Sequence, residues 1–94
     1  MTDPVQAFQD RLLVQAFRDG PMTRVLRGAT PAEVAKIRAT VRSSDAYTTC
    51  TLLNNAAFAW LWQALESRRI HPVDANLRVM MLNAFFYVNF ESAH

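Results

Sequence analysis

The sequence predicts an all-α protein: a small helical bundle forming one domain over residues 1–94, with a long antiparallel helical hairpin at its C-terminal end. Apolar residues recur at spacings of three and four, and no stretch shows the apolar–polar alternation of a strand. Hydrophobic residues make up 51% of the chain and charged residues only 19%. A chain of 94 residues does not easily bury that much apolar surface alone, so we expect a homo-oligomer.

The first helix is expected from Pro4 to Arg18. Asp3 can cap it, and proline suits a first helical position because an N–H there would have no partner within the helix. The turn signal at residues 19–21, Asp-Gly-Pro, should end it. A short helical turn over residues 22–27 is expected to follow.

The second helix starts at the clearest signal in the chain. Residues 30–33, Thr-Pro-Ala-Glu, form a capping box with proline at the first helical position. We expect the helix to run up to the two serines at residues 43–44. It would then carry Arg38 and Arg42 one turn apart on one face.

The third helix is expected over residues 45–69. Its apolar side chains cover an arc of roughly 200° at ~100° per residue. Asn54 falls inside this arc and needs a hydrogen-bond partner if it is buried. Trp60 and Trp62 lie about 200° apart, so at most one of them can reach deep into the core of a single chain.

The fourth helix, over residues 73–92, is apolar nearly all round. A helix of this kind must be buried on two sides. The other helices of one chain can cover one side, and we expect a second subunit to cover the other. The predicted oligomer interface consists of Val79, Leu82, Phe86 and Phe90.

The sequence lacks the residue patterns of catalytic and metal-binding sites. Cys50 lies in an apolar stripe and is interpreted as a small buried residue rather than a nucleophile. His71 and His94 are the two histidines, too few for a histidine-based metal site. Two glycines, Gly20 and Gly28, cannot form a glycine-rich phosphate loop. We therefore expect no enzyme activity, no metal and no cofactor.

The cellular location follows from two missing signals. The first residues are polar and lack the basic and apolar regions of a signal peptide. Neither of the two richest apolar stretches reaches the ~20 residues needed to span a bilayer. We expect a cytoplasmic protein that does not enter a membrane.

The net charge of +2 is unevenly distributed, because residues 24–42 carry +4 and the segments on either side −1 each. This basic excess has three interpretations: a solvated surface, a nucleic-acid contact, or a clamp for a small anionic ligand. DNA binding is the least favoured, because residues 45–69 would form the recognition helix and are too apolar for a groove. The candidate binding residues in this region are Arg24, Arg27, Arg38 and Arg42, with Asn54 as a further candidate.

The end of the chain resembles a known family over residues 84–89, Ala-Phe-Phe-Tyr-Val-Asn. This segment is similar to the closing helix of a family of phage-encoded helical hairpin proteins. Those proteins sequester cyclic nucleotides and so block CBASS or Thoeris defence. The resemblance implies that Tyr87 and Asn89 contact a ligand. Val88 is larger than the usual residue, and residues 81–83 replace the acidic segment of that family.

These observations lead to a function hypothesis with two alternatives. We expect a non-catalytic binding protein, a small oligomeric interaction or inhibitor module of viral type that acts on a host protein by protein–protein contact. The first alternative is an oligomer that sequesters a small anionic ligand such as a cyclic nucleotide. The second is a DNA-binding regulator.

Overall fold

The computed structural model describes the backbone of residues 3–18, 20–40 and 45–93, and the side chains of these residues except 46 and 88–93. Every regular element in these ranges is a helix, so the all-α prediction is confirmed. The elements are α1 (Pro4–Leu13), the π-helical turn η1 (Val14–Arg18), α2 (Met22–Val25), α3 (Pro31–Ala39), α4 (Ala46–Glu66) and α5 (Pro72–Ala93).

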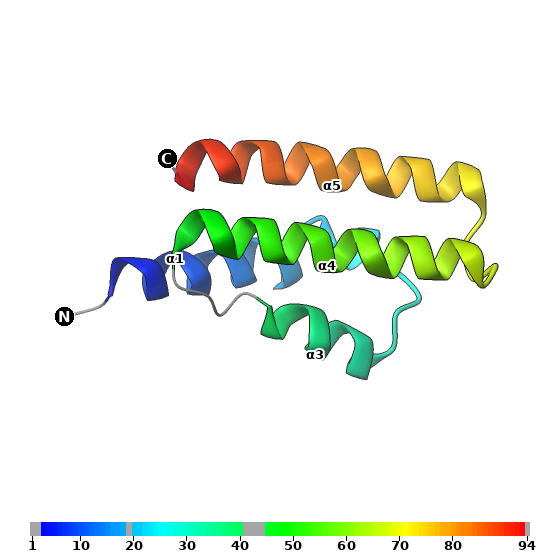
Figure 1. Ribbon diagram of the computed structural model, residues 1–94, viewed down its shortest axis with the longest axis horizontal. Helices are drawn as coiled ribbons and strands as arrows, with labels where there is room; N and C mark the ends of the chain where they lie inside the picture. Colours follow the sequence, from blue (N-terminus) through cyan, green and yellow to red (C-terminus); the bar gives the residue numbers. More distant parts are fainter. Residues whose placement is uncertain (1–2, 19, 41–44, 94) are drawn as a thin grey trace.

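The two long helices determine the shape of the molecule. Figure 1 shows α4 and α5 side by side, running in opposite directions, with α3 on the other side of α4. A helix of 21 or 22 residues is about 30 Å long, and the whole molecule extends over 46 × 26 × 21 Å. Helix α4 contacts α1, α3 and α5, whereas α2 contacts α5. The single chain therefore wraps short helices around α4 and leaves other sides of the long helices open.

Side chains cap three of the helix starts, and those of α1 and α3 are capped by the residues that the sequence predicted. The carboxylate of Asp3 accepts a hydrogen bond of 3.0 Å from the backbone N–H of Val5. The capping box of α3 is complete: the Thr30 hydroxyl accepts from the Glu33 N–H at 3.1 Å, and the Glu33 carboxylate accepts from the Thr30 N–H at 2.9 Å. Asp45 caps α4 by accepting from the backbone N–H of Thr48 at 2.7 Å.

The sequence predicted one α-helix from Pro4 to Arg18. The α-helix instead ends at Leu13, and a π-helical turn follows from Val14 to Arg18. The chain then folds back closely on this turn. A Cβ atom at Gly20 would lie 1.6 Å from the carbonyl oxygen of Gln15. Only glycine fits here, so Gly20 permits the tight return that leads into α2.

Two helix ends also differ from the prediction. Helix α3 ends at Ala39, where the Thr40 hydroxyl donates to the Ile37 carbonyl at 2.6 Å. Such a side-chain bond satisfies a carbonyl of the last turn, as helix-terminating threonines do. Helix α4 ends at Glu66 rather than Arg69, because Arg68 adopts a left-handed conformation with φ of 62°.

The core lies between α4 and the elements around it. Small side chains on α4, Cys50 and Ala57, are fully buried and allow the neighbouring helices to approach closely. Gln9 and Thr49 form a buried hydrogen bond of 3.2 Å between α1 and α4. The buried apolar residues are Phe8, Leu12, Ala16, Met22, Val25, Leu26, Ile37, Cys50, Leu53, Ala57, Trp60, Leu61, Ala64, Ile70, Ala75, Leu82 and Phe86.

The predicted oligomer interface on the last helix is wrong for two of its residues. Leu82 and Phe86 are 0% and 2% exposed and belong to the core of the single chain. Val79 is partly buried against the same core, and the side chain of Phe90 lies outside the described residues. Helical periodicity showed that both faces of this helix are apolar, but it did not show which face turns inward.

Candidate functional site

A buried arginine determines which face of α5 turns inward. Arg78 is only 8% exposed and binds the Asp74 carboxylate through Nη2 at 2.9 Å and Nε at 3.1 Å. Its Nη1 donates to the carbonyl of Arg27 at 2.7 Å and to that of Val25 at 3.3 Å. These bonds join α5 to the end of α2. Because Leu82 lies one turn after Arg78, the same orientation takes Leu82 into the core.

The opposite face of α5 carries a row of exposed apolar side chains, which we call the outer stripe: Val73, Leu77, Met80, Ala84 and Tyr87. The four large members are 63%, 55%, 66% and 70% exposed in that order. Their spacing alternates between four and three residues, as at the a and d positions of a coiled coil. The prediction that one side of this helix lacks a covering element in the single chain is therefore confirmed on the outer stripe.

Helix α4 adds a second exposed apolar surface. Phe58 and Trp62 are both exposed and lie one turn apart on the same face of the helix. Trp60, in contrast, is buried, which confirms that only one of the two tryptophans reaches the core. Sequence reasoning left open which of them would be outside.

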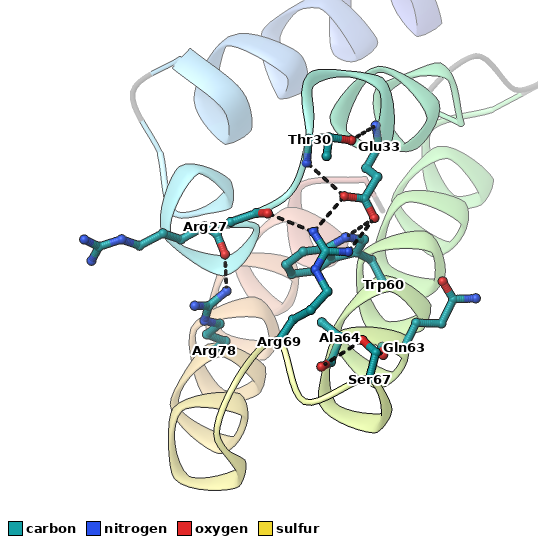
Figure 2. A network of polar contacts seen from close by, with 10 residues as sticks. Arg27, Thr30, Glu33, Trp60, Gln63, Ala64, Ser67, Arg69 and Arg78 are labelled. Atoms are coloured by element: carbon teal, nitrogen blue, oxygen red, sulfur yellow. Dashed lines mark hydrogen bonds and ion pairs between the residues drawn. The ribbon is translucent and has the colours of Figure 1, made fainter.

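A polar network between α3 and the end of α4 explains why Trp60 is the inner tryptophan (Figure 2). Its indole Nε1–H donates to Glu33 Oε2 at 2.9 Å. Arg69 forms a bidentate pair with the same carboxylate, at 3.0 and 2.9 Å, and its guanidinium carbon lies 5.5 Å from the Trp60 ring centroid. Arg69 also donates to the Gly28 carbonyl at 2.9 Å.

The electrostatics of this network favour an ionised Glu33. Hydrogen bonds from Arg69 and from the backbone N–H of Thr30 lower the pKa of Glu33 from 4.5 to about 2. The bond from Trp60 acts in the same direction. The network holds the start of α3 against the end of α4, so its role is to fix the fold.

Three of the four predicted basic residues fall within the described part of the chain. Arg24, Arg27 and Arg38 are exposed, and Figure 2 shows the Arg27 side chain pointing away from the polar network. Arg38 stacks on Phe17, with its guanidinium carbon 5.6 Å from the ring centroid. Arg42 lies outside the described residues, so its predicted place beside Arg38 is not observed.

One arginine that sequence reasoning missed completes a groove between η1 and α3. This arginine groove has a volume of about 350 Å³ and is lined by Leu13, Val14, Phe17, Arg18 and Arg38. Arg18 was missed because it lies outside the basic segment, in the part of the sequence whose net charge is −1. Only the fold brings it to Arg38.

The other predicted binding residues lie elsewhere. Asn54 and Tyr87 do not line the arginine groove. The Oδ1 atom of Asn54 is screened from solvent and has no hydrogen-bond partner among the described residues. Tyr87 is exposed on the outer stripe, and the side chain of Asn89 lies outside the described part of the chain.

The single cysteine is a buried core residue, as predicted. Cys50 is fully buried, and this burial raises the pKa of its thiol to about 11. In the described part of the chain, no group of three or more His, Cys, Asp or Glu residues could hold a metal ion. Among the same residues, every helix is too short or too polar to cross a membrane.

Comparisons with known proteins give no relative for this chain. No protein-family model matches it, and neither curated proteins nor solved structures give a significant match. The resemblance of residues 84–89 to the phage hairpin proteins therefore stays a prediction from the sequence.

Proposed function

We propose that the protein is a non-catalytic interaction module that acts by protein–protein contact and assembles as a homo-oligomer. In this proposal, α4 and α5 form the hairpin on which the oligomer is built, and the outer stripes of two copies pack against each other. The observation that carries the proposal is the exposure of Val73, Leu77, Met80 and Tyr87 along one side of a single helix. Contiguous apolar surface of this kind marks an interaction site.

The spacing of the outer stripe favours another helix as its partner. A repeat of 3.5 residues keeps the side chains in line with a second helix that crosses at a small angle. Ala84, a small side chain in the C-terminal half of the stripe, would let the two backbones approach closely there. A flat or irregular partner would gain nothing from this regular spacing.

Charge favours a second copy rather than a charged partner. Between residues 72 and 90, Asp74 and Arg78 are the charged residues of α5, and they pair with each other within the same chain. The outer stripe itself is uncharged, so two identical stripes can meet without like-charge repulsion. A symmetric dimer uses one patch twice, which a self-complementary apolar row can satisfy.

The available area is at the lower end of what a specific contact needs. The four large side chains of the outer stripe expose on the order of 500 Å² in each copy, so a pair of stripes buries at most about 1,000 Å² through them, the lower bound for a specific interface. At about 25 cal/mol per Å² of apolar surface, removing this area from water is a substantial driving force.

The test is the absolute mass in solution, measured by light scattering on a sizing column. We expect the wild type to elute with the mass of at least two 10.7 kDa chains. Met80→Asp places a charge in the outer stripe and should give a single-chain mass. Ala35→Asp adds the same charge at an exposed position of α3, away from the stripe, and should leave the oligomer intact.

Circular dichroism melting of each variant shows whether the fold is retained. A wild type that runs as one chain at high micromolar concentration would contradict the proposal. Dissociation by Ala35→Asp to the same extent as by Met80→Asp would show that an added charge disrupts assembly wherever it lies, and would also exclude the outer stripe as the specific contact.

A further inference from the structure

A second surface, independent of the outer stripe, has the chemistry of an anion site. The arginine groove, a hollow of about 350 Å³, is lined by two arginines, Arg18 and Arg38. Arg18 also lines the neighbouring hollow together with Arg24. Three exposed arginines therefore surround the end of η1, although only Arg24 and Arg38 come from the basic segment of the sequence.

These arginines are not neutralised by carboxylates in the described part of the chain. The ion pairs there are Arg69–Glu33 and Arg78–Asp74, so Glu33, the acidic residue of α3, is already paired with another arginine. Among the described residues, no hydrogen bond involves the guanidinium group of either Arg18 or Arg38. Concentrated positive charge without local partners raises the affinity of a surface for anions.

The arginine groove is pre-shaped rather than formed by flexible side chains alone. The Arg38 guanidinium rests on the Phe17 ring at 5.6 Å, a cation–π contact that leaves its N–H donors free at the edge. Phe17 and Arg18 are consecutive residues of the π-helical turn, a geometry that often occurs at functional sites. Gly20 permits the close return of the chain that ends this turn.

The lining also offers an apolar surface next to the charges. Leu13, Val14 and Phe17 supply the apolar part of the groove lining, and Val14 is itself exposed. Small-molecule sites typically have volumes of ~300–1,000 Å³ and combine apolar walls with a few polar groups. Two forked guanidinium groups are suited to phosphate oxygens, which they can bind in a bidentate manner.

We propose that the arginine groove binds a small phosphate-bearing molecule of about nucleotide size. Arg18 and Arg38 contact its phosphate, and its apolar or aromatic part packs against Leu13, Val14 and Phe17. The site is complete within one chain and does not depend on the outer stripe.

The experiment is isothermal titration calorimetry at low ionic strength with four probes: pyrophosphate, AMP, ATP and uncharged adenosine. We expect AMP and ATP to bind, pyrophosphate to bind more weakly because it lacks the part that packs against the apolar lining, and adenosine to give no signal. Arg18→Gln and Arg38→Gln should each weaken AMP and ATP binding about tenfold, the size expected for a lost charge-assisted hydrogen bond. All variants change exposed residues, and their melting temperatures check the fold.

The matched control is Arg11→Gln. Arg11 is also exposed and also stacks on a phenylalanine, Phe8, at 5.7 Å, but it does not line the arginine groove. Its variant removes the same charge and should bind within about twofold of the wild type. The Met80→Asp variant should also bind normally, because the site lies within one chain.

Several results would overturn this assignment. They are no binding of any phosphate-bearing probe, equal binding of adenosine and AMP, and equal losses in Arg11→Gln and Arg38→Gln. A single-stranded oligonucleotide that binds more tightly than ATP, and is lost in the same variants, would instead identify a nucleic-acid contact and exclude the small ligand.

Discussion

The inner and outer faces of α5 carry similar apolar side chains but differ completely in their surroundings. Leu82 and Phe86 on the inner face are buried in the core, whereas Leu77 and Met80 on the outer face are exposed. Burying either face would gain a comparable hydrophobic free energy per unit area. Only the inner face contains Arg78, whose donors need acceptors once the helix packs. Polar contacts therefore orient a helix that hydrophobicity alone leaves undecided.

The same substitution made on both faces should affect stability very differently. Leu82→Ala should lower the free energy of unfolding by about 2–5 kcal/mol, because it leaves a cavity in the core. Leu77→Ala should change it by less than about 0.5 kcal/mol, because the side chain is solvated. Urea denaturation measures both.

These two variants are compared in the Met80→Asp background, so that self-association does not contribute to stability. Equal losses for Leu82→Ala and Leu77→Ala in this single-chain form would show that the inner and outer faces of α5 do not differ in burial.

The orienting role of the polar contacts is tested by Arg78→Met. The variant keeps an apolar stem but leaves the Val25 and Arg27 carbonyls without their donor and Asp74 without its partner. We expect a loss of about 2 kcal/mol in the free energy of unfolding, measured by urea denaturation. Arg27→Met changes an exposed side chain but keeps the same backbone carbonyl, and should have little effect.

Helix α4 shows a similar contrast between buried and exposed positions near Asn54, which lies between the core and the exposed Phe58. Its Oδ1 atom is buried without a partner among the described residues, and such an atom carries a desolvation penalty. Asn54→Leu should raise the free energy of unfolding by about 1 kcal/mol. Asn55→Leu, at the exposed neighbouring position, is the control; an equal gain there would attribute the effect to helix propensity instead.

The smallest expected effect concerns the polar network that orients α4. The folded pKa of Glu33 is about 2, below its ordinary 4.5. The ionised form is therefore favoured by folding, and its stabilising effect is complete above pH 4.5 and is lost as the pH falls toward 2. The difference in Tm between wild type and Glu33→Gln should shrink over this interval.

Arg69→Gln removes the main cause of the lowered pKa and should reduce the same pH dependence. A Tm difference between wild type and Glu33→Gln that stays constant down to pH 2 would contradict the assigned ionic contact.

Much of the fold could be predicted from local signals. The starts of α1, α3 and α4 follow Asp3, Thr30 and Asp45, because a cap is a contact between residues a few positions apart. The ends were less accurate. Arg68 ends α4 by adopting a left-handed backbone conformation, and Thr40 ends α3 with a side-chain hydrogen bond. Neither residue type predicts a helix end by itself.

The candidate sites were predicted less well than the fold. The surplus of apolar residues correctly indicated an open face on α5, but Leu82 and Phe86 were assigned to the wrong side of it. Arg38 was identified in the basic segment, whereas its neighbour Arg18 was not, because the contact between η1 and α3 joins residues 20 positions apart in the chain.

Residue type and the spacing within one helix were enough to predict the helices, their starts, the buried cysteine and the excess of apolar surface. Only the folded chain shows which face of α5 is inside, which tryptophan is buried, and which arginines share a groove. These properties depend on pairings such as Arg78 with the Val25 and Arg27 carbonyls. Such pairings join distant segments, and helical periodicity carries no information about them.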